Sequence, residues 1–123
     1  MNKIIIIMII IIITYCNYLA YLVISGLNVQ ISSSYSLTCG EAWGIICNQG
    51  DYLEYHRHDP CMFSFVYYVT SPKDSSPLLF TTSGYEVNPE PGKVVIFNSR
   101  LLHEIPPNNC NGRYSFVGNL SVV

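Results

Sequence analysis

Residues 91–115 read PGKVVIFNSRLLHEIPPNNCNGRYS. Within this stretch, two runs rich in Val, Ile, Leu and Phe are each followed by residues that favour turns, NSR after the first run and PPNN after the second. β-branched and aromatic residues favour strands, whereas clusters of Pro, Asn and Gly favour turns. The stretch therefore predicts two short β-strands, at residues 93–98 and 101–105, and the start of a third at Arg113.

The same pattern continues on both sides of this stretch. The composition predicts further strands at residues 43–47, 52–56, 63–70 and 78–82, and a last strand at residues 113–122. We find no amphipathic helix pattern in the sequence after residue 41. Short strands separated by turns are typical of an all-β barrel or jelly roll. The sequence therefore predicts one such domain over residues 41–123, preceded by a polar, Ser-rich linker at residues 30–40.

The N-terminal segment, residues 1–29, is strongly apolar. Residues 4–13 are isoleucine interrupted by one methionine, and no charged residue lies between Lys3 and Glu41. Residues 4–27 are long enough to cross a bilayer, which needs ~20 residues. The segment fits three interpretations: a membrane or signal anchor, an apolar strand at the edge of the barrel, or an extension outside the fold. The first interpretation predicts a membrane-anchored protein and the others a cytoplasmic one.

Composition excludes some classes of partner. The formal net charge of the 123 residues is −2, so there is no broad basic field for nucleic acid. The five cysteines include no closely spaced pair, which argues against a zinc ribbon or a disulfide framework. The candidate chemistry therefore has to come from other residues.

The three histidines of the chain are His56, His58 and His103. Residues two apart on a strand point to the same face, so His56 and His58 can reach one ion. His103 falls on a later strand, and a jelly roll can bring distant strands face to face. Non-haem iron is commonly held by three facial protein ligands that leave other positions open. We therefore predict a metal site at these three histidines.

Arg113 and Ser115 form a second candidate site at the start of the last predicted strand, where they share one face. A guanidinium binds a carboxylate through two parallel hydrogen bonds, and a hydroxyl can add a third. An arginine pointing into a barrel without such a partner would be a costly buried charge. We therefore expect a dicarboxylate here. The competing interpretation is that Arg113 lies exposed after the Asn111-Gly112 turn.

Together these segments resemble the 2-oxoglutarate/Fe(II)-dependent oxygenases. The resemblance is carried, in the order seen in that family, by residues 50–59 (GDYLEYHRHD), 64–69 (SFVYYV), 91–105 and 112–115 (GRYS). It extends over residues 41–123 and is most specific from Pro91 through His103 to Ser115. The chain looks like small members from phages and marine microbes, and more distantly like prolyl hydroxylases.

The resemblance implies a double-stranded β-helix, with Fe(II) at His56 and His103 and 2-oxoglutarate at Arg113 and Ser115. It implies a dioxygenase that hydroxylates an unknown substrate with O₂ and releases succinate and CO₂. No catalytic side chain is expected beyond the metal centre. The likeness to prolyl hydroxylases suggests a peptide as the substrate.

One position departs from the family pattern. The family usually has His-x-Asp, whereas this chain has His58 where the Asp would fall, with Asp59 next to it. By strand alternation Asp59 faces away from the metal, unless the strand ends early at Pro60, which cannot donate to a β-ladder. We favour His58 as the third ligand and keep Asp59 as the alternative.

Two other classes of protein compete with the oxygenase. A cupin also has a glycine ahead of a His-x-His pair, as Gly50 is here, but the Glu of that pattern is absent after His58 and His103 lies far behind Gly92. The other competitor is a non-catalytic remnant, which binds a metal or nothing, because the barrel is short for an oxygenase. Arg113 discriminates among them, since only the oxygenase needs it for 2-oxoglutarate.

Overall fold

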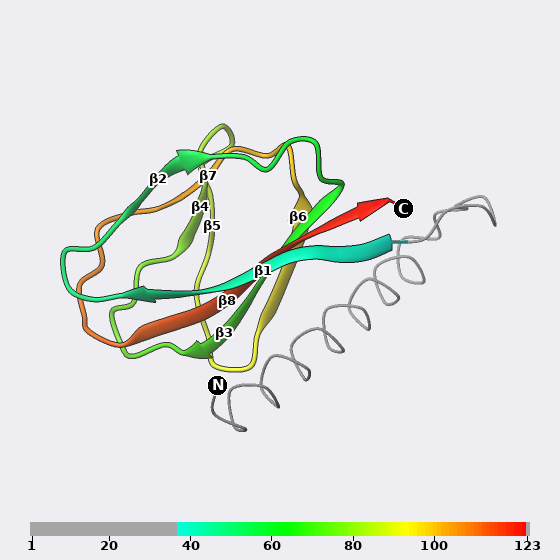
Figure 1. Cartoon of the computed structure of the whole chain (residues 1–123). Coiled ribbons are helices and arrows are strands. Elements are labelled where there is room, and N and C mark those ends of the chain that lie inside the picture. Colours follow the sequence, from blue (N-terminus) through cyan, green and yellow to red (C-terminus); the bar gives the residue numbers. More distant parts are fainter. Residues whose placement is uncertain (1–36, 123) are drawn as a thin grey trace, which may run out of the picture.

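The computed structural model describes residues 37–122, and this part of the chain consists of eight strands joined by turns and loops (Figure 1). No helix occurs among these residues. The strands are β1 (Leu37–Cys47), β2 (Leu53–His56), β3 (Phe63–Thr70), β4 (Leu78–Phe80), β5 (Tyr85–Val87), β6 (Val94–Asn98), β7 (His103–Ile105) and β8 (Arg113–Val122).

The strands form two antiparallel four-stranded sheets. Sheet A has the order β1-β8-β3-β6 and sheet B the order β2-β7-β4-β5. The chain changes sheet at every connection except the one between β4 and β5, which are hydrogen-bonded neighbours. Segments far apart in sequence therefore become neighbours, and β1 and β8 run side by side across the molecule (Figure 1). This is a double-stranded β-helix, or jelly roll, and it confirms the predicted all-β fold.

The core lies between the two sheets. Val66, Tyr68 and Phe97 from sheet A meet Leu78 from sheet B, and each of these side chains is buried. Burial of large apolar side chains contributes roughly 1.5–3 kcal/mol each.

Gly118 on β8 is required by close packing within sheet A. It pairs with Phe65 on the neighbouring strand β3. A Cβ atom at Gly118 would lie 2.5 Å from the Phe65 ring and 3.0 Å from the carbonyl oxygen of Glu41. The ring of Phe65 therefore occupies the space that any other side chain would need.

The predicted strands agree with the structure in position but not always in length. β3 and β8 have the expected bounds, whereas β1 begins at Leu37, inside the stretch predicted as a linker, because it pairs with β8 as far as Val122. β5 was not predicted. The N-terminal segment, residues 1–29, lies outside the described residues. Within residues 37–122, no helix has the length and apolar character needed to cross a bilayer.

Candidate metal centre and ligand pocket

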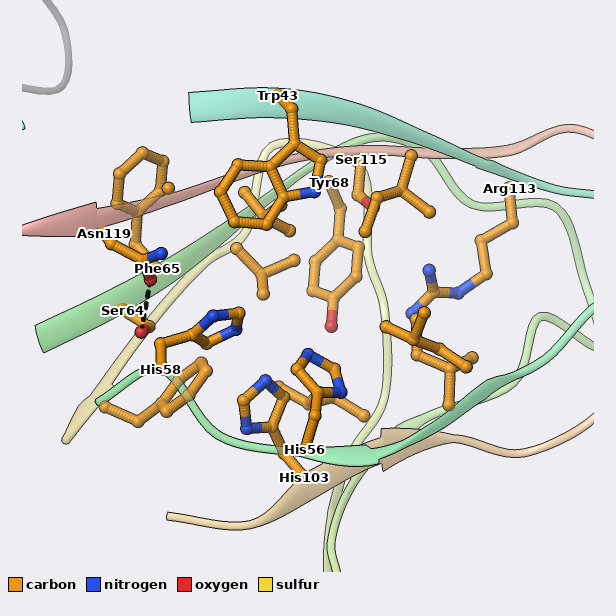
Figure 2. Close-up of a pocket in the computed structure, with 18 residues that line it drawn as sticks. Trp43, His56, His58, Ser64, Phe65, Tyr68, His103, Arg113, Ser115 and Asn119 are labelled. Carbon is orange, nitrogen blue, oxygen red and sulfur yellow. Dashed lines mark hydrogen bonds between the residues drawn. The ribbon is translucent and has the colours of Figure 1, made fainter. Parts of the chain in front are cut away.

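His56 and His103 face each other across two neighbouring strands of sheet B. They are register partners on β2 and β7, with ring centroids 4.3 Å apart. The sheet crossovers therefore bring together two histidines from opposite ends of the domain sequence, as the jelly-roll prediction required. Directly paired residues on antiparallel strands have side chains on the same face, so both rings point into the barrel (Figure 2).

His58 completes the group from a loop. Its ring centroid lies 4.9 Å from that of His56 and 5.1 Å from that of His103. One ligand atom from each of the three histidines lies within 4.8 Å of the others. The strand argument was wrong for His58, because β2 ends at His56 and alternation no longer applies. The loop that follows β2 turns the His58 ring back toward the other two (Figure 2).

Backbone carbonyls orient two of the three rings. The Nδ1 atom of His56 lies 2.8 Å from the carbonyl oxygen of Glu54, and Nδ1 of His103 lies 2.8 Å from that of Leu101. A carbonyl oxygen can only accept, so each Nδ1 carries the proton and each Nε2 keeps a free lone pair. Metal-binding histidines are commonly held in this way by a partner on the second nitrogen.

The environment favours neutral imidazoles. Burial lowers the pKa of His103 to about 4, against a smaller opposing effect of the Leu101 carbonyl. Burial also lowers the pKa of His58, and the neighbouring His56 adds to this effect. Only neutral imidazole offers a lone pair to a metal ion. At neutral pH His58 and His103 are therefore ready to bind one.

Asp59, the alternative third ligand, belongs to a different group of side chains. Its carboxylate lies 2.8 Å from Nε of Arg57 and 3.4 Å from Nε of Arg100, at a partly exposed position. Among the described residues, the group of side chains able to hold a metal contains the three histidines and not Asp59.

Arg113 is buried at the first position of β8, with 1% of its surface exposed. The competing expectation of an exposed Arg113 is wrong, because β8 enters the barrel directly after the turn at Gly112. Its Nε donates a hydrogen bond to the carbonyl oxygen of Ser76 over 3.1 Å, but Nη1 has no hydrogen-bond partner among the described residues. The guanidinium also lies 5.3 Å from the centre of the Tyr68 ring. A buried cation with so few partners is costly unless an anion completes the site.

Ser115 and Tyr68 present two further polar atoms without a partner. Ser115 lies on the same face of β8 as Arg113 and pairs with Tyr68 on β3. The Ser115 Oγ and the Tyr68 hydroxyl are both buried, and neither has a hydrogen-bond partner in the part of the chain that the structure describes. Burial raises the pKa of Tyr68, against the opposing charge of Arg113, so its hydroxyl stays protonated and can donate.

Sequence reasoning found Ser115 but missed Tyr68. A tyrosine in an aromatic-rich strand is commonly a core residue, and nothing near Tyr68 in the sequence indicates that its hydroxyl faces a ligand pocket. The signal was the register: Tyr68 lies opposite Ser115, two residues beyond Arg113 on β8. That pairing is only available once β3 and β8 are known to be neighbours.

One cavity of about 280 Å³ joins the histidines to this polar group. His56, His58 and His103 line one side of it, and Arg113, Ser115 and Tyr68 line the other (Figure 2). Apolar side chains such as Trp43, Phe65, Leu78, Phe97, Ile105 and Val117 form much of the remaining wall. The cavity can therefore hold a small molecule whose one end meets a metal at the histidines and whose other end meets the guanidinium.

Several solved structures that share this fold are oxygenases or prolyl hydroxylases. The chain is similar to an oxidoreductase of the 2OG-Fe(II) oxygenase family from Burkholderia pseudomallei, with TM-score 0.69 and 16% identity over 83% of this chain and 51% of that one. It is also similar to a Pseudomonas putida prolyl-4-hydroxylase, with TM-score 0.56 and 24% identity over 82% and 59% of the two chains.

A third similar structure is the 2OG complex of a viral collagen prolyl hydroxylase from Paramecium bursaria Chlorella virus-1. Its TM-score is 0.61, with 15% identity over 79% of this chain and 64% of the viral one. No protein-family model and no curated protein matches the sequence. The chain spans between about half and two-thirds of the lengths of these three structures.

The fold and the site together define an all-β barrel with a histidine group able to bind a metal ion. Its fold is that of the 2-oxoglutarate/Fe(II) oxygenases and prolyl hydroxylases, which confirms the resemblance stated from the sequence at the level of fold.

Proposed function

We propose that the chain is a 2-oxoglutarate- and Fe(II)-dependent dioxygenase. The observation that carries this proposal is the pairing, in one cavity, of three convergent imidazoles with a buried guanidinium that lacks a partner. A keto acid with a second carboxylate is complementary to both features, because one end chelates a metal and the other neutralises the cation.

His56, His58 and His103 would hold the iron, and imidazole nitrogen is a suitable donor for this ion. When bound, iron and 2-oxoglutarate supply the oxidising chemistry, in which O₂ and the keto acid convert a substrate C–H to C–OH and release succinate and CO₂. The protein itself contributes neutral ligands that are already oriented, since the carbonyls of Glu54 and Leu101 fix two of the rings.

Arg113, Ser115 and Tyr68 would bind the far carboxylate of 2-oxoglutarate. Nη1 of Arg113 and the two hydroxyls are donors buried without an acceptor, and a carboxylate offers about four lone-pair sites to them. The apolar wall of the cavity excludes water, which strengthens each of these interactions. Occupation of the site by an anion thus offsets the cost of burying the guanidinium.

For the substrate we infer a peptide, because two of the similar structures are prolyl hydroxylases. A comparison of succinate release with and without proline-containing peptides tests this inference.

The experiment that tests the function begins with anaerobic protein loaded with Mn(II). We expect calorimetric titration to show 2-oxoglutarate binding only when the metal is present, and succinate to form when Fe(II) and O₂ replace Mn(II). Metal-independent binding would contradict the shared cavity. Metal binding without any 2-oxoglutarate binding would instead identify a metal-binding barrel that is not an oxygenase.

A further inference from the structure

His58 is held differently from the other two histidines. His56 and His103 lie on strands and have a backbone carbonyl on Nδ1, whereas His58 lies in the loop between β2 and β3. Neither ring nitrogen of His58 has a hydrogen-bond partner among residues 37–122. The ring of Trp43 on β1 packs against that of His58, with ring centroids 5.9 Å apart. The backbone position of His58 depends on what fixes the loop.

Ser99, directly after β6, binds this loop at two points, His58 and Met62. The backbone N–H of His58 donates to the carbonyl oxygen of Ser99 over 2.8 Å, and the N–H of Ser99 donates to the carbonyl oxygen of Met62 over 3.1 Å. A third bond, from the N–H of Cys61 to the carbonyl oxygen of His58 at 2.9 Å, closes the loop on itself. The backbone position of Ser99 thus sets the backbone position of His58.

The Ser99 side chain is in turn tied to the centre of sheet A. Its hydroxyl lies 2.8 Å from the hydroxyl of Ser64 on β3, and the Ser64 hydroxyl donates to Oδ1 of Asn119 on β8 over 2.8 Å (Figure 2). Ser64 and Asn119 are also register partners in the sheet. The three side chains form a continuous hydrogen-bonded chain from two central strands to the loop.

All three of these polar side chains are buried, with 0% of Ser99, 2% of Ser64 and 3% of Asn119 exposed. Apolar residues of similar size would pack in their places without needing partners. The polar groups instead satisfy one another and extend beside the cavity, where Ser64 and Asn119 form part of the wall. Within residues 37–122, none of the fully buried polar side-chain atoms of these three residues lacks a partner. A satisfied buried network is rigid and defines one arrangement of the elements that it joins.

We propose that Ser64, Ser99 and Asn119 are positioning residues that hold His58 within the metal-binding set. The network transfers the rigidity of the sheet to a ligand that has no orienting bond of its own. Outer-shell partners of metal ligands typically change metal affinity 10- to 100-fold when they are removed. This inference rests on the metal centre of the proposed function, but not on 2-oxoglutarate or on turnover.

The test is a double-mutant cycle with Co(II) affinity of the full chain as the readout. Ser64→Ala removes both side-chain hydrogen bonds of the network, and we expect about a 10- to 100-fold loss of Co(II) affinity. In the His58→Ala background the same substitution should change the affinity less than about twofold, because there is no ligand left to position. Equal losses in both backgrounds would overturn the proposal and assign Ser64 to general stability.

Three further variants keep the test decisive. Ser76→Ala is a matched control, because Ser76 is also buried and its hydroxyl donates to the Pro107 carbonyl, away from His58. Its Co(II) affinity should equal that of the wild type, and a loss as large as that of Ser64→Ala would overturn the proposal. If Ser64→Ala fails to fold, Asn119→Ala replaces it in the cycle, and Asn119→Asp, which retains the acceptor oxygen, should restore most of the affinity.

The visible spectrum of the Co(II) complex adds a signature that a change in stability alone would not produce. We expect the spectrum of Ser64→Ala to shift toward that of His58→Ala, since both lose the third imidazole. An unchanged spectrum at saturating Co(II) would overturn the positioning role. Absence of Co(II) binding by the wild type would refute the metal centre itself, and with it the proposed function.

Discussion

Replacing Arg113 with methionine should separate the stability of this barrel from its ability to bind 2-oxoglutarate. Methionine retains much of the side-chain volume at a position that is only 1% exposed, and it removes the charge. The metal ligands are untouched, so metal affinity serves as the internal control.

The structure gives the expected change in stability. Within residues 37–122, Nε of Arg113 donates a hydrogen bond to the carbonyl of Ser76 and the guanidinium lies over the face of the Tyr68 ring, while Nη1 is without a hydrogen-bond partner. Loss of the hydrogen bond costs about 1 kcal/mol and loss of the cation–π contact about 1–2 kcal/mol. Relief of the buried charge is worth about 1–4 kcal/mol in the opposite direction. We therefore expect the free energy of unfolding of the ligand-free variant to stay within about 2 kcal/mol of that of the wild type.

The effect on 2-oxoglutarate binding should be a large loss. Removal of one partner from a buried charge pair costs about 2–5 kcal/mol, which corresponds to about a thirtyfold or greater loss of affinity. Arg113→Lys should retain part of the affinity, because an ammonium keeps the charge but cannot form two parallel hydrogen bonds.

Two measurements check this prediction: urea unfolding of the ligand-free protein, and calorimetric titration of 2-oxoglutarate into the anaerobic Mn(II)-loaded protein. A variant destabilised by more than about 2 kcal/mol would show that the guanidinium is a structural element. Equal 2-oxoglutarate affinity in wild type and variant would refute the role of Arg113 in binding.

Three further perturbations follow from the described contacts. His58→Ala should lose more bound iron than Asp59→Ala, because the Asp59 carboxylate pairs with exposed arginines and not with the histidines. Metal analysis of the two purified variants measures this, and the reverse order would make Asp59 the ligand. The free energy of unfolding of the metal-free protein should fall by up to about 3 kcal/mol as the pH falls from about 6.5 to about 4. His103 is protonated in that range in the unfolded chain, whereas in the folded chain its pKa is about 4 and it stays neutral over most of the range. Urea midpoints at several pH values measure this, and a His103→Gln variant with the same slope would disprove the assignment. Gly118→Ala should destabilise the fold by about 1–3 kcal/mol through its clash with Phe65. Thermal unfolding of the variant measures this loss of stability, and an unchanged melting temperature would contradict the prediction. Adding Phe65→Leu to Gly118→Ala should restore part of the lost stability.

Local pattern was sufficient for most of the strands and for two of the three histidines. β3 and β8 are long and rich in β-branched and aromatic residues, so their bounds could be predicted from composition. β5 has three residues and a largely exposed surface, so no periodicity reveals it. The start of β1 depends on pairing with β8, which is a tertiary effect that the polar sequence before residue 41 conceals.

The chemistry of the site was harder to predict where it depends on register or on a loop. Tyr68 becomes a polar group of the cavity only through its pairing with Ser115, and no local feature predicts which strands are neighbours. The His58 prediction reached the right cluster through an incorrect mechanism, since the residue is placed by the loop anchored at Ser99 and not by strand alternation.

The acceptors that orient His56 and His103 are main-chain oxygens, at Glu54 and Leu101. A substitution at Glu54 or Leu101 leaves the backbone carbonyl in place. The hydrogen bonds that orient the His56 and His103 rings therefore do not depend on the side chains at these two positions. His58 relies instead on the side chains of Ser64, Ser99 and Asn119, and each of these can be lost by a single nucleotide change. As related sequences diverge, the His58 corner of the site should therefore vary first, while the pair of His56 and His103 persists on its strands.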